Sequence, residues 1–235
     1  YKNMNQTTNN SQKELLSEAE TNIPKNLPEL ERYLQNYSHD DQAIKTIQQF
    51  SKNLKQTKYR QDVFSEKGAL IRKPIYYQDV VEKGLADPEK DSFTLLQGDI
   101  VSTNAAYFLG NRRENSKFAI ASSTCDLVKG RRNYAALLRI QPISSRDPNA
   151  KEILSQLLKF TSTQKMYLPR LPDDSSDIVG NALLFDGIVQ IKLDDLLLAT
   201  RHASLSLVGW RIFGSMVRSI IVRAGEEEVK MRSSL

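Results

Sequence analysis

The stretch that decides the fold is residues 98–145, GDIVSTNAAYFLGNRRENSKFAIASSTCDLVKGRRNYAALLRIQPISS. It contains three short apolar runs, at residues 99–101, 118–121 and 134–143, which are separated by two segments rich in turn-forming residues. Runs of this length that are rich in Ile, Val, Phe and Tyr and are bounded by Gly, Asn and Ser are typical of strands. The stretch therefore predicts three neighbouring strands of one antiparallel sheet.

The two segments between these strands are strongly basic. Only Glu114 and Asp126 oppose their positive charges, and the local excess of five equals the net charge of the whole chain. Loops that join successive antiparallel strands project from the ends of a sheet, so we expect a polyanion-binding site there. Seven basic residues lie between positions 110 and 140: Arg112, Arg113, Lys117, Lys129, Arg131, Arg132 and Arg139.

Length and composition set wide limits. A chain of 235 residues can form one large domain, or a main domain with an appendage. The sequence holds one cysteine, Cys125, which excludes a disulfide within the chain and fits a reducing cytoplasm. No run of eighteen apolar residues occurs, so we expect no membrane-spanning helix.

The residues before the basic stretch predict helices. Asn26, with a proline two residues later, is expected to open one helix, and apolar residues at helical spacing in 44–54 predict the next. The polar segment 86–92, ADPEKDS, is the clearest linker in the chain. We therefore expect a domain boundary there.

The residues after the basic stretch predict further strands and a closing helix. Residues 166–171 are expected to form an edge strand because Pro169 cannot donate to a ladder. Residues 182–191 predict a pair of strands that turn at Asp186 and Gly187. Apolar residues between 208 and 221 repeat with helical period after a Ser206 cap. The chain is thus expected to comprise a disordered lead-in, a helical segment with a linker, a main domain and a charged tail: residues 1–10, 11–92, 93–225 and 226–235.

Motifs that carry chemistry are few. His39 and His202 lie in opposite arms of the chain, Cys125 is far from both, and no metal-ligand spacing occurs. The glycine motifs of phosphate loops and dinucleotide sites are also absent from the sequence. Neither histidine stands in a recognisable nucleophile motif, and His202, next to Arg201, is expected at the surface or at a helix cap. We therefore expect neither a metal nor another cofactor.

A resemblance to a known family emerges from four segments: 98–101 (GDIV), 118–127 (FAIASSTCDL), 134–144 (YAALLRIQPIS) and 185–195 (FDGIVQIKLDD). Together they resemble the MazF/PemK toxin family, in which a G-D-I/V strand precedes a V-V-V-S-type strand and a strand ending in P-I/L-T. The resemblance covers about residues 95–223. It implies an α+β fold with a small SH3-like antiparallel barrel and added helices, generally as a homodimer.

The resemblance further implies a toxin that cleaves single-stranded RNA or mRNA without a metal. The 2′-hydroxyl of the RNA attacks the adjacent phosphate, which requires a proton acceptor and cations that stabilise the pentavalent phosphate. The family uses an arginine before the second strand and a threonine after the third, and Lys117 and Ser144 hold these positions here. Arg112 and Arg113 could supply the guanidinium that Lys117 lacks. The expected RNA-binding residues are Arg112, Arg113, Lys117, Lys129, Arg131, Arg132 and Arg139.

A second function stays open because the site departs from the family pattern and the helical segment has no counterpart in the toxin barrel. In this alternative, a catalytically inactive barrel serves as a regulatory binding module in a stress or phage-defence system. The N-terminal helices or the barrel groove would hold a protein partner, such as an antitoxin, a sigma factor or a protease. The expected location is cytoplasmic on either hypothesis.

Overall fold

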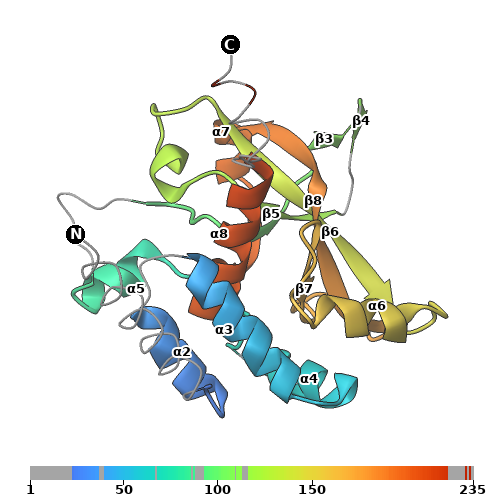
Figure 1. Ribbon diagram of the computed structural model, residues 1–235. Coiled ribbons are helices and arrows are strands. Elements are labelled where there is room, and N and C mark those ends of the chain that lie inside the picture. Colours follow the sequence, from blue (N-terminus) through green and yellow to red (C-terminus); the bar gives the residue numbers. More distant parts are fainter. Residues whose placement is uncertain are drawn as a thin grey trace.

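The computed structural model describes residues 23–36, 40–66, 68–85, 87, 93–108, 110–112, 116–221, 231 and 233. Within them the fold is α+β, as predicted, and consists of a curled antiparallel half-barrel of seven strands with helices packed against it (Figure 1). The strands follow the order β1–β9–β2–β5–β6–β8–β7 across the sheet. Their bounds are β1 Ile71–Arg72, β2 Ile100–Ser102, β5 Lys117–Ile120, β6 Tyr134–Ser144, β7 Lys165–Leu168, β8 Ile178–Lys192 and β9 Thr200–Leu205.

The three strands expected from the basic stretch are confirmed. They are β2, β5 and β6, which are antiparallel neighbours in the sheet. The predicted edge strand is also confirmed, because β7 pairs with β8 and ends the strand order. The basic segments therefore do connect successive strands of one sheet.

The expected turn at Asp186 and Gly187 is wrong, because β8 continues through both residues. Gly187 has a φ of 114°, and a Cβ atom there would come within 2.7 Å of the Phe108 ring. Near this point the pairing of β6 with β8 shifts register, between Leu138 and Ile140. A glycine inside a strand together with a register shift bends the strand and does not reverse it. The bend contributes to the curl of the half-barrel.

The helices include those predicted from Asn26 and Ser206. The Asn26 side chain accepts a hydrogen bond from the Glu29 N–H, and Ser206 Oγ accepts one from the Gly209 N–H. Both bonds satisfy backbone donors that a helix start leaves free. The helices are α2 Leu27–Gln35, α3 Asp40–Asn53, α4 Thr57–Phe64, α5 Tyr77–Glu82, α6 Ala150–Leu157, α7 Leu193–Leu197 and α8 Leu207–Ile221, with a 3₁₀ turn at Thr124–Leu127 and a small hairpin of β3 Tyr107–Phe108 and β4 Asn111–Arg112.

The two faces of the curled sheet support two apolar cores. One face of β2, β5 and β6 contributes Val101, Phe118 and Leu137 to a smaller core that α7 closes. The opposite face contributes Ile100 and Ala119, among others, to a larger core. Alternate residues of a strand point to opposite faces, so each of these strands serves both cores.

The larger core includes the N-terminal helices. Ile47 and Phe50 of α3 and Phe64 of α4 are buried in the same cluster as residues of β7, β8 and α8. The view in Figure 1 shows α3 beside α8, with α6 and β7 at one end of β8 and α7 at the other. The domain boundary at residues 86–92 stays a prediction, because residue 87 alone is described there. Among the described helices, none has the length and apolar character needed to cross a membrane.

Candidate active site

A β-bulge places His202 between two neighbouring strands. Along β2, the consecutive residues Ile100 and Val101 pair with Ala203 and Arg201 of β9, so His202 is the extra residue of β9. Bulges redirect side chains and are frequent beside active sites. The His202 side chain is 9% exposed, which makes the expectation of a surface or helix-cap histidine wrong.

His202 connects a carboxylate to a hydroxyl. Its Nδ1 lies 2.5 Å from Asp173 Oδ2, and its Nε2 lies 2.8 Å from Ser102 Oγ. When the imidazole is neutral, Nδ1–H donates to the carboxylate, and the Nε2 lone pair accepts the Ser102 hydroxyl proton. A base oriented by a carboxylate and bonded to a hydroxyl is the arrangement that catalytic histidines adopt in hydrolases.

Lys117 lies beside this histidine. It is the direct partner of Ser102 in the pairing of β2 with β5, and directly opposed residues project on the same face of a sheet. Its Nζ donates to Asp174 Oδ1 at 2.8 Å, and both side chains are mostly buried. Burial opposes the charged form of Asp174, but the hydrogen bonds from Lys117, Asn181 and the Leu171 N–H outweigh it and lower the pKa of Asp174.

Ser144 contacts the same acidic segment at another point. Its Oγ donates to Asp177 Oδ2 at 3.1 Å, and Arg146 Nε lies 3.9 Å from the same oxygen. Hydrogen bonds from Ser175 Oγ and then from Ser144 lower the pKa of Asp177. Because Phe118 pairs with Arg139, Lys117 is about four residues from Ser144 along β6, roughly 13 Å. The two expected catalytic residues therefore lie at separate points along the sheet, and their joint catalytic role stays a prediction.

One short segment, residues 173–177, connects all these groups and is called the acidic loop here. Its three carboxylates, Asp173, Asp174 and Asp177, bind His202, Lys117 and Ser144, respectively. Asn181 anchors the loop by donating to Asp174 Oδ2 at 2.8 Å, and Arg170 donates to its carbonyls. His202, Lys117 and Ser144 thus each contact an intrachain carboxylate.

A buried ion pair fixes the strand that carries the histidine. Arg201 Nη2 lies 2.8 Å from Asp99 Oδ2, and the Asp99 side chain is fully buried. The same guanidinium donates to the Ile75 and Thr94 carbonyls. Burial raises the pKa of Asp99, although Ser204, the Leu96 N–H and Arg201 donate to its carboxylate. The pair holds β9, and so His202, against β2.

A pocket of about 490 Å³ opens next to Ser102. Its walls come from the segment after β2 and from the α7–β9 connection. This volume lies within the range of small-molecule sites. The lining residues are Ser102, Thr103, Asn104, Ala105, Asp195, Leu198, Ala199 and Thr200.

The other expected RNA-binding residues are distributed around the half-barrel. The Arg139 guanidinium packs 4.1 Å from the centroid of the Phe108 ring, an inward cation–π contact. Arg131 donates to the Cys125 carbonyl, Arg132 lies 3.4 Å from Asp126, and Lys129 lines a separate pocket near Tyr76.

The remaining two expected site residues are Arg112 and Arg113. Arg112 lies in β4, whereas Arg113 lies outside the residues that the structure describes. Among the described residues, no group of three His, Cys, Asp or Glu side chains is placed to hold a metal ion. The binding role of the seven basic residues therefore stays a prediction.

Known proteins do not match this chain: no family model, no curated protein and no solved structure shows a significant similarity. The site is therefore interpreted from its own geometry. That geometry assembles a base, an orienting carboxylate, a hydroxyl and a cation from four separate segments, which suits proton abstraction from a hydroxyl next to an anionic group.

Proposed function

We propose that the protein is a metal-independent endoribonuclease that acts on single-stranded RNA through His202. The chain Asp173–His202–Ser102 is the single observation that carries the proposal, since it places an oriented base on a hydroxyl next to Lys117. In this proposal the half-barrel is a variant of the SH3-like MazF/PemK barrel, and the toxin-like activity follows from the same resemblance.

The Ser102 hydroxyl occupies the position that the reacting 2′-hydroxyl of the RNA takes in the complex. His202 Nε2 accepts the 2′-hydroxyl proton as the 2′-oxygen bonds to phosphorus. Asp173 stabilises the imidazolium that forms, and Lys117 neutralises charge on the pentavalent phosphate. The bond from phosphorus to the 5′-oxygen breaks, the 5′-oxygen takes a proton from water, and the hydroxide that remains accepts the proton held by His202. A 2′,3′-cyclic phosphate is left on the RNA.

RNA binding in this scheme competes with the acidic loop. A phosphate that reaches Lys117 replaces the Asp174 carboxylate, and a neighbouring phosphate replaces Asp177 at Ser144 and Arg146. This accounts for the roughly 13 Å between Lys117 and Ser144, because the two residues contact different phosphates of one strand. The basic loops then extend the contact with the backbone.

A second candidate activity is hydrolysis with Ser102 as the nucleophile. It is favoured by the 2.8 Å contact between Ser102 Oγ and His202 Nε2, which is the separation a serine nucleophile needs from its base. Both candidates require His202, but Ser102 reacts only in the second. The net charge of +5 and the cation beside the base favour the phosphodiester substrate.

The experiment separates the candidates by two substitutions. We expect the wild type to cleave mixed-sequence RNA in the presence of a chelator and His202→Ala to lower the rate by about 10²–10⁴-fold. Ser102→Ala should leave RNA cleavage within about threefold of wild type, because the 2′-hydroxyl replaces the serine. Ser219→Ala is the matched control, since this hydroxyl donates to the Met216 carbonyl in α8.

Three outcomes would redirect the assignment. Loss of activity in both Ser102→Ala and His202→Ala, without a cyclic phosphate product, would make Ser102 the nucleophile. Full RNA cleavage by His202→Ala would overturn the proposed site. No cleavage of naked RNA or of mRNA on translating ribosomes would favour the regulatory binding module and its protein partner.

A further inference from the structure

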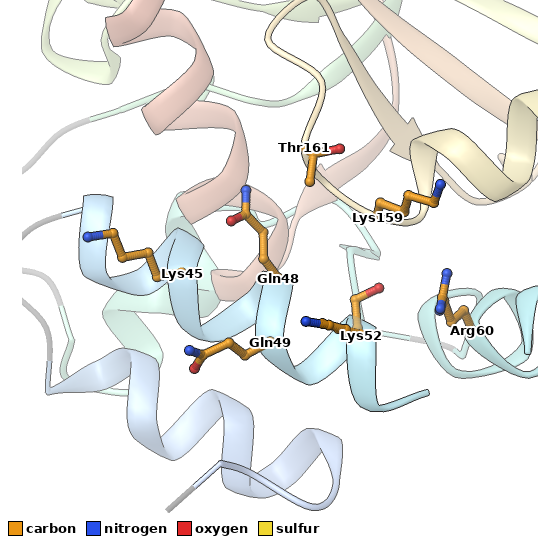
Figure 2. Close-up of a pocket in the computed structure, with 8 residues that line it drawn as sticks. Lys45, Gln48, Gln49, Lys52, Arg60, Lys159 and Thr161 are labelled. Atoms are coloured by element: carbon orange, nitrogen blue, oxygen red, sulfur yellow. The ribbon is translucent and has the colours of Figure 1, made fainter. Parts of the chain in front are cut away.

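A second concave site lies among the N-terminal helices and shares no residue with the cluster around His202. Its side chains come from α3, from α4 and from the loop that follows α6 (Figure 2). The volume is about 490 Å³, which is within the range of small-ligand sites. We call it the basic pocket, and its lining residues are Lys45, Gln48, Gln49, Ser51, Lys52, Arg60, Lys159 and Thr161.

The charges of the basic pocket are all positive. Three lysines and one arginine line it, and its other lining residues are neutral and polar. Within the described part of the chain, none of the four cations forms an ion pair. Like charges around one concavity repel each other and raise the local concentration of anions.

The walls of the pocket are held by hydrogen bonds across the two segments. Gln48 Nε2 donates to the Phe160 carbonyl at 2.8 Å, and Ser51 Oγ donates to the Leu158 carbonyl. Arg60 Nε donates to the Leu54 carbonyl at 2.5 Å, which fixes the guanidinium at the pocket. The arginine therefore presents its remaining N–H donors from a fixed position.

The loop beside α3 has an unusual backbone at its centre. Phe160 has a φ of 53°, which is uncommon for a residue with a side chain. Its buried ring packs edge-on against Phe64, with centroids 4.7 Å apart, and this packing stabilises the conformation. The conformation sets Lys159 and Thr161 on either side of the bend, where both line the pocket. Conformations of this kind concentrate at functional sites.

We propose that the basic pocket binds an oligophosphate, either free or carried on a nucleoside. Four cations on two walls match the several charges of such a group, and guanidinium and ammonium donors form charge-assisted bonds with phosphate oxygens. The methylene stems of the lysines and glutamines supply apolar surface for an attached base. Cations placed around one concavity also suit a compact ligand better than a long strand, which needs cations spread along a groove.

The test measures binding of inorganic triphosphate and of ATP to the full chain by titration calorimetry. We expect Lys52→Gln and Lys159→Gln each to weaken triphosphate binding by about tenfold, as loss of a charge-assisted bond does. Lys151→Gln is the matched control, because it removes the same charge from an exposed site on α6 outside the pocket. Tighter binding of ATP than of triphosphate would indicate a nucleotide, and equal binding would indicate a free oligophosphate.

Two results would overturn the proposal. An equal loss in Lys151→Gln would mean that the overall charge, and not the pocket, attracts the anion. Absence of triphosphate and ATP binding, together with RNA binding that Lys52→Gln weakens, would assign the pocket to a nucleic acid strand. Neither result bears on RNA cleavage by His202, because the two sites have no residue in common.

Discussion

The cluster around His202 and the basic pocket differ in whether their positively charged side chains lie beside carboxylates. In the cluster, the acidic loop provides a carboxylate for His202, for Lys117 and for Ser144. In the basic pocket, four cations line the cavity with no acidic residue in the lining. The difference teaches that the net charge of +5 does not locate a binding site in this chain; the local pairing of charges does.

The two regions should also respond differently to an anionic ligand. The cluster must release intrachain carboxylates before phosphates can bind, so its affinity includes the cost of displacing the acidic loop. The basic pocket presents its donors without such a competitor among the described residues. Ligand binding there should therefore relieve repulsion between cations and stabilise the fold.

The substitution with the largest expected effect removes a phenylalanine ring that packs beneath the basic pocket. Phe64 is fully buried and packs edge-on against both Phe50 and Phe160. Phe64→Ala should lower the free energy of unfolding by about 3–5 kcal/mol, measured by denaturant titration, because it leaves a cavity in the larger core. It should also weaken triphosphate binding, since Phe160 then loses the contact that fixes its backbone.

Phe64→Leu is the control, because a near volume-conserving change should cost less than about 1.5 kcal/mol. Equal stability of Phe64→Ala and wild type would mean that the N-terminal helices contribute little to the core. That result would agree with the domain boundary expected at residues 86–92, which limited proteolysis near residue 88 tests directly. A resistant linker and a large loss in Phe64→Ala would indicate one cooperative unit.

The sequence predicted the elements whose signals are local. The strands β2, β5 and β6 have apolar runs between turn residues, and α8 has a helical period after a capping serine. The hairpin at Gly187 failed because a dipeptide that favours turns also permits a bend in a continuous strand. The continuous strand forms because β8 pairs with β6 on both sides of Gly187. This pairing joins residues far apart in the chain, so a local sequence pattern cannot reveal it.

The candidate site was less predictable, and the reason is the distance along the chain. Ser102 and His202 are 100 residues apart, and Asp173 is 29 residues from His202. No short motif can contain such a set, so it becomes visible only when β2 pairs with β9. Lys117 was proposed because a family resemblance placed it at a strand start, whereas its partner Asp174 lies in an acidic loop that had no assigned role.

The second test removes one carboxylate of the acidic loop. Asp174→Asn should lower stability by about 1–3 kcal/mol at pH 7, because mostly buried Lys117 loses its ionic partner. The pKa of Asp174 is lowered by folding, so its stabilising contribution is present above its ordinary pKa and is lost as pH falls through the folded value. The stability difference between wild type and variant should therefore shrink as the pH falls below the ordinary pKa of an aspartate.

The same substitution should act on the proposed RNA site in the other direction. Without the charge of Asp174, no carboxylate competes with an RNA phosphate for Lys117. RNA affinity should therefore rise by about threefold. Asp79→Asn is the matched control, since Asp79 is an exposed carboxylate on α5. A pH-independent stability difference, or weaker RNA binding in Asp174→Asn than in Asp79→Asn, would contradict a loop that competes with phosphate.

The smallest test asks whether the basic loops add to the RNA site. Arg131 and Arg132 are exposed. The Arg131 guanidinium donates to the Cys125 carbonyl, and Arg132 Nε lies 3.4 Å from Asp126 Oδ1. Arg131→Gln with Arg132→Gln should lower the slope of log affinity against log salt by about one unit, because single-stranded RNA releases about 0.7 counterions per phosphate contact. Fluorescence anisotropy with a labelled RNA across a salt series measures this slope.

The control replaces Arg72 and Lys73, two exposed cations at β1, by glutamine. If both pairs change the slope equally, the loops contribute general charge and not a defined contact. An unchanged slope in the loop variant confines RNA binding to the neighbourhood of Lys117.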